Sequence, residues 1–374
     1  MAAKRFGSGV AWWVSLVLAG ATTGCDGDAS AAKGSSPPEA SAAARKPAPP
    51  PPVELVWPTP NKAYAEGRGL EACIQPTVSG LVTSGLFGSV RSGGAQFHEG
   101  LDLFPLEHDR KGEAVDAVGA AMAGVVRHVN TRAGASSYGR YVVLEHPAQS
   151  PAVYTLYAHL AEIAPGIAPG VEVKAGGLLG MMGRSAGGYT IPKDRAHLHF
   201  EIGVKMTESF AAWYKRRGFG SPNEQGLYNG MNLMGLDPLD FFARRRAGGL
   251  RALDEVFREL PAAVTLRIAH PGTPDYIRRY PSLTQAGSES ETDAITTAGG
   301  WEIDFSVTGV PVRWRRLDAG EFTGWKSGEV RILSADKALL AQNRARKLVQ
   351  TRRGVDVPGD DLRTVLEQVF AWRG

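Results

Sequence analysis

Three short segments carry side chains suited to metal chemistry. "FHEGLD" places His98 four residues before Asp102, "YAHL" contains His159, and "AHLHFEI" contains His197 and His199. Imidazole nitrogens and carboxylate oxygens are ligands that Zn²⁺ accepts in proteins. Each segment alone has an ordinary explanation, such as an exposed strand face or simple packing. Because all three occur in order, each in a β-strand context, they predict a metal site.

The spacing within two segments limits how they can bind a metal. In an extended strand His98 and Asp102 would lie about 13 Å apart, whereas zinc ligands must each approach to roughly 2.0–2.2 Å. Gly100 between them predicts a bend that lets both side chains converge. His197 and His199 share one strand face, roughly 6.6 Å apart. This spacing lets one bind a metal while the other reaches the water or substrate beside it.

"AHLHFEI" alternates as a strand does, with an apolar face behind the two histidines. The apolar face holds Ala196, Leu198, Phe200 and Ile202. Glu201 shares the polar face with the histidines. Of its two interpretations, a partner of a ligand or a solvated carboxylate, the solvated one is preferred.

Short apolar, β-prone runs dominate from Val53 to about Phe242, and Gly and Pro interrupt them every 8 to 12 residues. They include "AAMAGVVRHV" and "AVYTLYAHL". This pattern predicts a mainly β fold with an antiparallel sheet. Residues 203–235 read as a long insertion or loop with a short helix around Ser209 to Arg217.

The character of the chain changes after "DPLDFFARRR", which predicts a boundary between residues 243 and 244. "AVTLRIA" and "WEIDFSVTGVPVRWRRL" alternate as strands, and residues 250–260 have helical spacing. "SADKALLAQNRARKLVQ" and "DDLRTVLEQVFAW" predict amphipathic helices, capped by Ser334 and by Asp360 or Asp361. We therefore expect a C-terminal α+β domain over 244–374, with a supporting or substrate-positioning role.

The N-terminus has the parts of an export signal. Lys4 and Arg5 precede a mostly apolar run from Val10 to Ala21, which is far shorter than the roughly 20 residues of a membrane-spanning helix. The end of residues 1–25 resembles a bacterial lipoprotein box, which implies a lipid anchor on Cys25. Residues 26–52 are rich in Ala, Ser, Gly and Pro and predict a disordered spacer. We expect an exported, membrane-anchored lipoprotein that faces the periplasm or cell wall.

The composition argues against a nucleic-acid-binding protein and against a disulfide-rich fold. With 42 basic and 38 acidic residues the net charge is only +4, and no basic stripe is interleaved with aromatic residues, so no nucleic-acid partner is expected. Two cysteines make no disulfide framework, and Cys73 is expected to be a small buried hydrophobic residue. Four histidines outside the motifs are expected to be ordinary loop or strand residues: His108, His128, His146 and His270.

From about Gln75 to Phe242 the chain resembles the lysostaphin-type zinc endopeptidases, which cut peptide cross-links in bacterial peptidoglycan. The segments that carry the resemblance are "SGLFGSVRSGGAQFHEGLDL", "GEAVDAVGAAMAGVVRHV", "YGRYVVLEH", "YTLYAHL", "AHLHFEI" and "DPLDFF". The stretch between Ile202 and Asp237 is longer than the family usually has, and the C-terminal domain is not covered. Tyr138 and Tyr157 lie in matching segments, where they are expected to line the groove.

The resemblance implies that His98, Asp102 and His199 bind Zn²⁺, and that His159 and His197 flank its open coordination position. Three protein ligands plus one water is the arrangement of a catalytic zinc, which lowers the pKa of its water towards about 7. Either flanking histidine can take the proton from that water. The family implies the sheet-lined groove of a lysostaphin-type core within residues 53–243.

Three functions are therefore compared. The preferred one is a zinc endopeptidase that hydrolyses peptidoglycan peptides. The second is a non-catalytic wall-binding regulator, because some members of the family have lost ligands and activate other wall enzymes. In this chain all five motif positions are intact, which argues against the second. The third is a metal-dependent enzyme that acts on another envelope polymer or protein. No feature of the sequence identifies a protein partner.

Overall fold

The computed structural model describes residues 52–91, 96–285, 298–343 and 345–373. The predicted signal, Cys25 and nearly all of the predicted spacer lie outside these residues. Residues 50–374 form one compact unit, and the boundary expected between residues 243 and 244 stays a prediction. No helix in the described ranges is long and apolar enough to cross a membrane.

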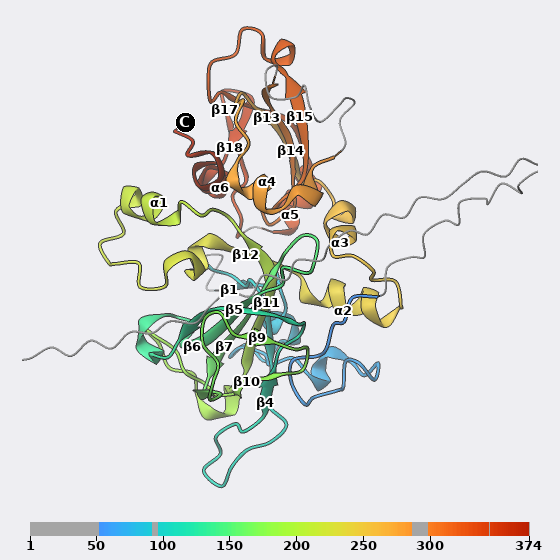
Figure 1. The fold of residues 1–374 in the computed structure, drawn as a ribbon, viewed down its shortest axis with the longest axis vertical. Coiled ribbons are helices and arrows are strands. Elements are labelled where there is room, and N and C mark those ends of the chain that lie inside the picture. Colours follow the sequence, from blue (N-terminus) through green and yellow to red (C-terminus); the bar gives the residue numbers. More distant parts are fainter. Residues whose placement is uncertain (1–51, 92–95, 286–297, 344, 374) are drawn as a thin grey trace, which may run out of the picture. The chain divides into compact units, whose positions relative to one another are not determined.

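The largest element is a seven-stranded antiparallel sheet (Figure 1). Its strands follow the order β12 (Leu233–Leu236), β11 (Leu198–Lys205), β7 (Tyr154–Leu160), β6 (Arg140–Glu145), β5 (Gly124–Asn130) and β9 (Glu172–Val173), while β3 (Leu101–Leu103) also pairs with β11. Both β3 and β12 pair antiparallel with β11, along different parts of its length. The mainly β, antiparallel prediction is confirmed.

Two small sheets flank this one, and single turns of 3₁₀ helix connect many strands. The sheets comprise β4 (Ala117–Gly119), β10 (Leu178–Met181) and β8 (Glu162–Ile163), and the pair β1 (Val90–Arg91) and β2 (Gln96–Phe97). The 3₁₀ turns are η1 (Leu70–Ala72), η2 (Val82–Gly85), η4 (Ala133–Ala135), η5 (Lys193–Arg195), η6 (Gly226–Tyr228), η7 (Gly230–Asn232), η8 (Pro281–Leu283) and η9 (Ala319–Phe322).

Strand β11 is buried on both faces. Leu198, Phe200 and Ile202 are fully buried, as the alternation predicted. Each such side chain stabilises the fold by about 1.5–3 kcal/mol. The opposite face is buried as well, and Glu201 has no exposed surface, so its predicted solvation is wrong. The candidate metal ligand His199 lies on this buried polar face of β11.

The predicted insertion contains the expected helix. Helix α1 spans Phe210–Arg217 after Ser209 and ends at Gly218, whose φ of 65° supplies the left-handed turn that ends many helices. The end of the insertion is not a loop, because β12 pairs with β11 there. Helix α2 (Pro238–Arg246) follows, and the carboxylate of Asp237 accepts a hydrogen bond from the amide of Leu239 at its start.

The C-terminal part has the predicted α+β character. Its sheet has the order β15 (Pro311–Asp318), β14 (Ala298–Phe305), β13 (Val264–Ile268) and β16 (Val330–Ala335), with a separate pair β17 (Val349–Arg352) and β18 (Val355–Pro358). The helices are α3 (Asp254–Glu259), α4 (Asp275–Arg279), α5 (Lys337–Gln342) and α6 (Asp360–Phe370). The strands predicted in "AVTLRIA" and "WEIDFSVTGVPVRWRRL" are confirmed.

Two details of the C-terminal helices differ from the predictions. Helix α5 begins after Asp336, whose carboxylate accepts from the amide of Leu339, while Ser334 belongs to β16. The rest of the predicted helix is not helical: residues 345–348 lie outside any helix or strand, and Val349 and Gln350 begin β17. Helix α6 begins after Gly359, and Asp361 accepts from the amide of Lys347 at 2.6 Å rather than capping its own helix. Pairing with neighbouring strands overrides the helical pattern.

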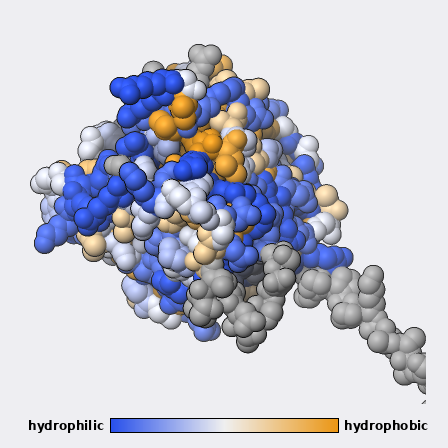
Figure 2. Space-filling model, turned by 90° about the horizontal axis from the view of Figure 1, so that it is seen from above, coloured by the Kyte–Doolittle hydropathy of each residue, from blue (hydrophilic) through white to orange (hydrophobic). Residues whose placement is uncertain are grey.

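The surface is not uniformly polar. Figure 2 shows hydrophobic residues gathered in one patch among hydrophilic residues on the face seen from above. In the described C-terminal part, Leu333 of β16 and Val355 of β18 are 50% and 62% exposed. Nothing in the structure indicates what covers them.

Candidate metal centre

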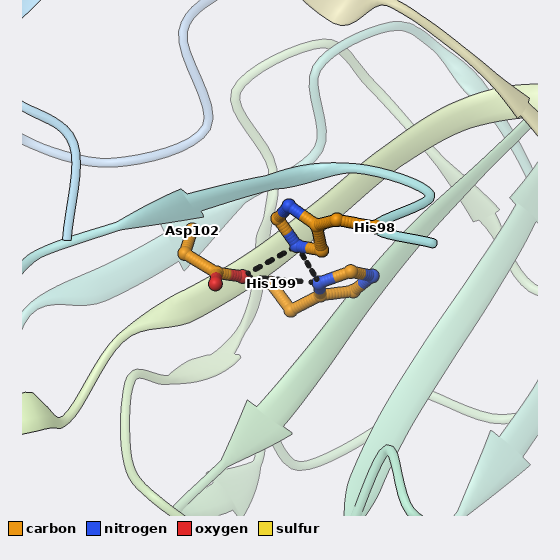
Figure 3. A group of neighbouring side chains, drawn as sticks. All are labelled: His98, Asp102 and His199. Carbon is orange, nitrogen blue, oxygen red and sulfur yellow. Dashed lines mark hydrogen bonds and ion pairs between the residues drawn. The ribbon is translucent and has the colours of Figure 1, made fainter. Parts of the chain in front are cut away.

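Three side chains predicted as ligands meet at one point. His98 Nε2 lies 3.0 Å from Asp102 Oδ1 and 3.1 Å from His199 Nδ1, and the same Asp102 oxygen lies 3.1 Å from His199 Nδ1. Figure 3 shows the three groups pointing toward one another. All three residues are buried, and they are the group of potential metal ligands found among the described residues.

Strand pairing brings these residues together. Strand β3 pairs with β11 in a register that sets Asp102 opposite His199, and His98 directly follows β2. Gly100 is needed between them for a reason other than the expected bend. A Cβ atom there would lie 2.3 Å from the carbonyl oxygen of Phe200, so only glycine lets the segment come this close to β11.

Outer hydrogen bonds fix the tautomers of both ligand histidines. Nδ1 of His98 lies 2.8 Å from the carbonyl oxygen of Leu86, and Nε2 of His199 lies 2.9 Å from Oε1 of Glu201. Carbonyl and carboxylate oxygens only accept, so these nitrogens carry the protons. In the neutral rings the nitrogens that face each other therefore carry no proton and present lone pairs, together with a carboxylate oxygen. Two neutral imidazoles and a carboxylate arranged in this way suit a cation.

Glu201 belongs to this site. Its carboxylate accepts hydrogen bonds from Tyr138 Oη at 2.7 Å and Tyr154 Oη at 2.6 Å, besides the one from His199. Burial and the nearby Glu201 charge raise the pKa of both tyrosines well above the usual value, so they remain donors. Carboxylates of this kind orient metal-binding histidines and increase their basicity. The position of Glu201 on the histidine face was the sequence signal for this role.

Arg91 holds the second oxygen of Asp102. Its Nη2 atom lies 2.7 Å from Oδ2, which leaves Oδ1 directed at the two histidines. Burial opposes ionisation of Asp102, but His98, His197 and His199 outweigh it and keep its pKa well below the usual value. The carboxylate is therefore ionised. Sequence reasoning missed Arg91, because no local pattern links it to a carboxylate eleven positions away.

The two other predicted residues lie beside the three ligands. The His159 ring is centred 4.8 Å from that of His197 and 6.0 Å from that of His199. Nδ1 of His159 donates to the carbonyl of Ser185 at 2.8 Å, and Nδ1 of His197 donates to the carbonyl of Arg195 at 2.7 Å. Both Nε2 atoms are thus left as acceptors.

His159 is held in an uncommon backbone conformation. Its φ is 61°, and the pairing of β6 with β7 shifts in register at this point. The amide of His159 donates to the carbonyl of Tyr138 at 2.9 Å, which holds the residue there. Left-handed non-glycine residues occur often at functional sites, where the surrounding structure fixes them.

Burial lowers the pKa of the histidines in this site, except where hydrogen bonds outweigh it. It lowers the pKa of His197, and together with His197 and His199 it lowers that of His159 well below the usual value, so both are neutral at pH 7. Burial also lowers the pKa of His98. For His199 burial acts in the same direction, but hydrogen bonds to Asp102 and Glu201 outweigh it and raise its pKa to about 9, so without a metal the ring is protonated at pH 7. A cation would bind Nδ1 by displacing its proton.

A groove of about 1720 Å³ opens over these side chains. Its lining includes all five predicted residues and Tyr138. Tyr157 does not line it, contrary to expectation, because its hydroxyl accepts from the amide of Ala121 in the core. The insertion and the C-terminal part also contribute wall residues, among them Trp213, Arg346 and Gln368.

Contacts between the insertion and α6 hold this wall in place. Trp213 Nε1 donates to Glu367 Oε2 at 3.0 Å, and Gln368 Nε2 donates to the carbonyl of Met231 at 2.7 Å. Trp213 is 3% exposed. The long insertion therefore serves as a platform for the C-terminal helix beside the groove.

The remaining residues considered in the sequence lie outside the metal centre. Cys73 is fully buried, as expected. His146 is buried between the carbonyl of Ala123 and the hydroxyl of Thr155, and His128 contacts Gln225. The described lining of the groove includes neither histidine.

One comparison with known proteins matches the segment that contains this site. Residues 96–210 match the model of peptidase family M23, and this range includes all five predicted residues. The comparison with curated proteins found no match.

Three solved structures illustrate the structural matches. A putative glycyl-glycine endopeptidase lytM from Ruminococcus gnavus is 31% identical, covering 29% of this chain and 40% of that one, with a TM-score of 0.23. A zinc-containing peptidase from Vibrio cholerae is 23% identical over 41% of this chain and 35% of that one, with a TM-score of 0.22. The catalytic domain of lysostaphin from Staphylococcus simulans is 18% identical over 42% of this chain and 89% of its own, with a TM-score of 0.26.

The first structure is matched over well under two thirds of its own length, and the three TM-scores lie below 0.5. The assignment therefore depends on the family match and on the motifs in the sequence. Residues 96–210 of this chain match peptidase family M23, and the chain resembles the lysostaphin-type peptidases.

Proposed function

We propose that the protein is a zinc-dependent endopeptidase that hydrolyses peptide cross-links of bacterial peptidoglycan. The observation that carries the proposal is the convergence of three potential ligand atoms, from His98, Asp102 and His199, beside two neutral histidines in an open groove. A structural zinc site would be closed by a fourth protein ligand. Among the described residues the cluster has three members, as a catalytic site requires.

The donor set fits Zn²⁺. Tetrahedral ligands at Zn–N distances of roughly 2.0–2.1 Å are separated by about 3.3 Å. The three donor atoms lie 3.0–3.1 Å apart, so a small outward movement accommodates the ion. Two nitrogens and one carboxylate oxygen suit this metal. A bound zinc supplies a polarised carbonyl and a water acidic enough to attack it near neutral pH.

The protein's own residues handle the proton. His159 and His197 both present an unprotonated Nε2 toward the groove, since their Nδ1 protons are used by backbone carbonyls. Either can take a proton from an attacking water and return it to the leaving amine. The histidine that has taken the proton can then donate to the oxyanion or to the departing group.

Digestion of purified cell wall tests this proposal against its alternatives. The protein should clear the wall, a chelator should stop clearing, and His159→Ala should reduce it by at least 10²-fold. The control His128→Ala, outside the metal centre, should leave it unchanged. Mass spectrometry should find newly freed amino groups at cross-linking residues. Binding to wall without any cleavage would favour the regulator, and cleavage of another polymer alone would favour the third function.

We also propose that the protein works at the cell envelope, anchored by a lipid on Cys25. The export-type start of the sequence and the Ala/Ser/Pro-rich segment after it support this. Fractionation of cells tests it. The protein should sediment with membranes, and Cys25→Ser should release it from them. Equal membrane association of both proteins would contradict the anchor.

A further inference from the structure

The loop between β10 and β11 places two residues on the groove wall beside the two histidines that are not ligands. The Tyr189 ring lies 6.4 Å from that of His159 and is 52% exposed. Arg195, in η5, accepts a hydrogen bond from Nδ1 of His197 through its backbone carbonyl. Both residues line the groove. The part of a substrate that adjoins the reacting amide would therefore meet this loop.

Arg195 differs from the other arginines of the groove in its charge partners. Arg91 pairs with Asp102 at 2.7 Å, while Arg217 pairs with Glu367 and Arg346 with Glu99, both at 3.5 Å. No described residue forms an ion pair or a side-chain hydrogen bond with the half-buried Arg195. Three of the four cations are thus neutralised within the fold, and Arg195 is left for a ligand.

The neighbouring Lys193, on the same turn as Arg195, does have partners for its charge. Lys193 lies in η5 too, but it contacts Glu113 at 3.1 Å and the carbonyl of Lys111 at 2.8 Å, and it does not line the groove. Glu113 is therefore already shared with Lys193 and with Arg184. Asp194, the other acidic residue at this turn, forms no ion pair with Arg195 among the described residues. Of the two basic residues in η5, Lys193 therefore contacts the fold, whereas Arg195 lines the groove.

We propose that Arg195 forms a carboxylate subsite, which binds a free carboxylate on the peptide residue next to the scissile amide. The inference rests on the proposed peptidase function and narrows its substrate class. A guanidinium presents two parallel N–H donors that match a carboxylate, and a partly desolvated pair of this kind is strong and directional. The hydrogen bond from His197 Nδ1 to its carbonyl holds the backbone of Arg195 beside the proposed reacting centre, and Arg195 lines the same groove. Tyr189 forms the wall on the side of His159, where its hydroxyl donates to the carbonyl of Ser137 at 3.2 Å.

Two synthetic peptides test the proposal. They are identical except that the residue adjoining the scissile bond carries a carboxylate in one and a carboxamide in the other. The native protein should cleave the carboxylate peptide with a kcat/KM about 10- to 100-fold higher, the worth of one charge-assisted hydrogen-bonded pair. In Arg195→Gln this ratio should fall to near one, and Arg195→Lys should retain part of it. The matched control Lys193→Gln should keep the native ratio.

A binding measurement separates this inference from the function on which it rests. Calorimetric titration of zinc-loaded His159→Ala with each peptide should give tighter binding of the carboxylate peptide, and adding Arg195→Gln should remove the difference. If neither peptide is cleaved, the proposed function fails and the binding preference still decides the inference. If the native protein cleaves both at equal rates and binds them equally, the function stands and the carboxylate subsite is refuted. If Arg195→Gln loses its zinc, the preference for the carboxylate peptide is compared between the native protein and Arg195→Lys instead. A lower preference in Arg195→Lys supports the subsite, and an equal preference refutes it.

Discussion

Oε1 of Glu201 lies 2.9 Å from Nε2 of His199, and this contact connects the metal centre to the interior of the sheet. Tyr138 and Tyr154 hold the same carboxylate from the other side. The ring of His199 therefore cannot rotate without breaking its hydrogen bond to the buried Glu201. This arrangement fixes which nitrogen would face a bound ion.

Glu201→Gln should weaken zinc binding by about 10- to 100-fold, because it removes the charge that orients His199 and increases its basicity. Competition with a fluorescent zinc chelator measures the affinity. Tyr154→Phe, which removes one donor to the carboxylate and leaves the contact with His199, should have a smaller effect. Unchanged zinc affinity in Glu201→Gln would show that the contact plays no part in the metal site.

Gly100→Ala should destabilise the protein by about 1–3 kcal/mol, because the added methyl group meets the backbone of β11 and cannot move aside. The Cβ atom would lie 2.3 Å from the carbonyl oxygen of Phe200. Urea unfolding gives the free energy of unfolding. Gly320→Ala is the matched control, since its Cβ would meet nothing within 4 Å. Equal stability of the two variants would mean that β3 and β11 are not this close.

Stability should fall in acid because of His146. Burial lowers its pKa to about 4, whereas the unfolded chain has an ordinary value near 6.5. The unfolded state therefore binds more protons between these values, so the stabilisation is complete above pH 6.5 and is lost as the pH falls towards 4. The loss should be about 3 kcal/mol.

Unfolding by urea at several pH values, in native protein and in His146→Gln, isolates this contribution. The variant lacks the titrating group, so the difference in stability between the two proteins should shrink as the pH falls from 6.5 to 4. A difference that stays constant over this range would contradict the buried neutral histidine.

Gln368→Ala should reduce kcat/KM on cross-linked wall more than on a short peptide, because it loosens the wall that α6 contributes to the groove. The side chain donates to the carbonyl of Met231 in the insertion. Gln350→Ala is the control, since its side chain also donates to a backbone carbonyl, that of Pro358, but outside the groove. Identical kinetics for the two variants on both substrates would exclude a positioning role for this wall.

Much of the fold could be predicted from local pattern. The strands around His159 and His199 follow runs of alternating or β-branched residues, and α1 follows a compact helical segment. The local pattern predicted the wrong secondary structure where pairing with residues distant in sequence determines it. Val349 and Gln350, the last residues of a segment that has helical spacing, pair with β18 and begin a strand instead.

The candidate site likewise contains residues that could be predicted from the sequence and residues that could not. His98, Asp102 and His199 could be chosen from residue type and motif, because the ligands themselves carry the pattern. The groups that hold them could not, since Arg91, the carbonyl of Leu86 and the tyrosine hydroxyls reach the site only through packing of distant segments. Glu201 was visible in the alternation, but its burial depended on elements that cover the sheet.

The metal content of the purified full-length protein tests the central claim most directly. After dialysis against a weak chelator, elemental analysis should find one zinc per chain in the native protein, and far less than one in Asp102→Ala and His199→Ala, each with an unchanged circular dichroism spectrum. A native protein that holds no zinc when supplied with it, or a His199→Ala variant that retains a full equivalent, would contradict the assignment of these side chains as its ligands.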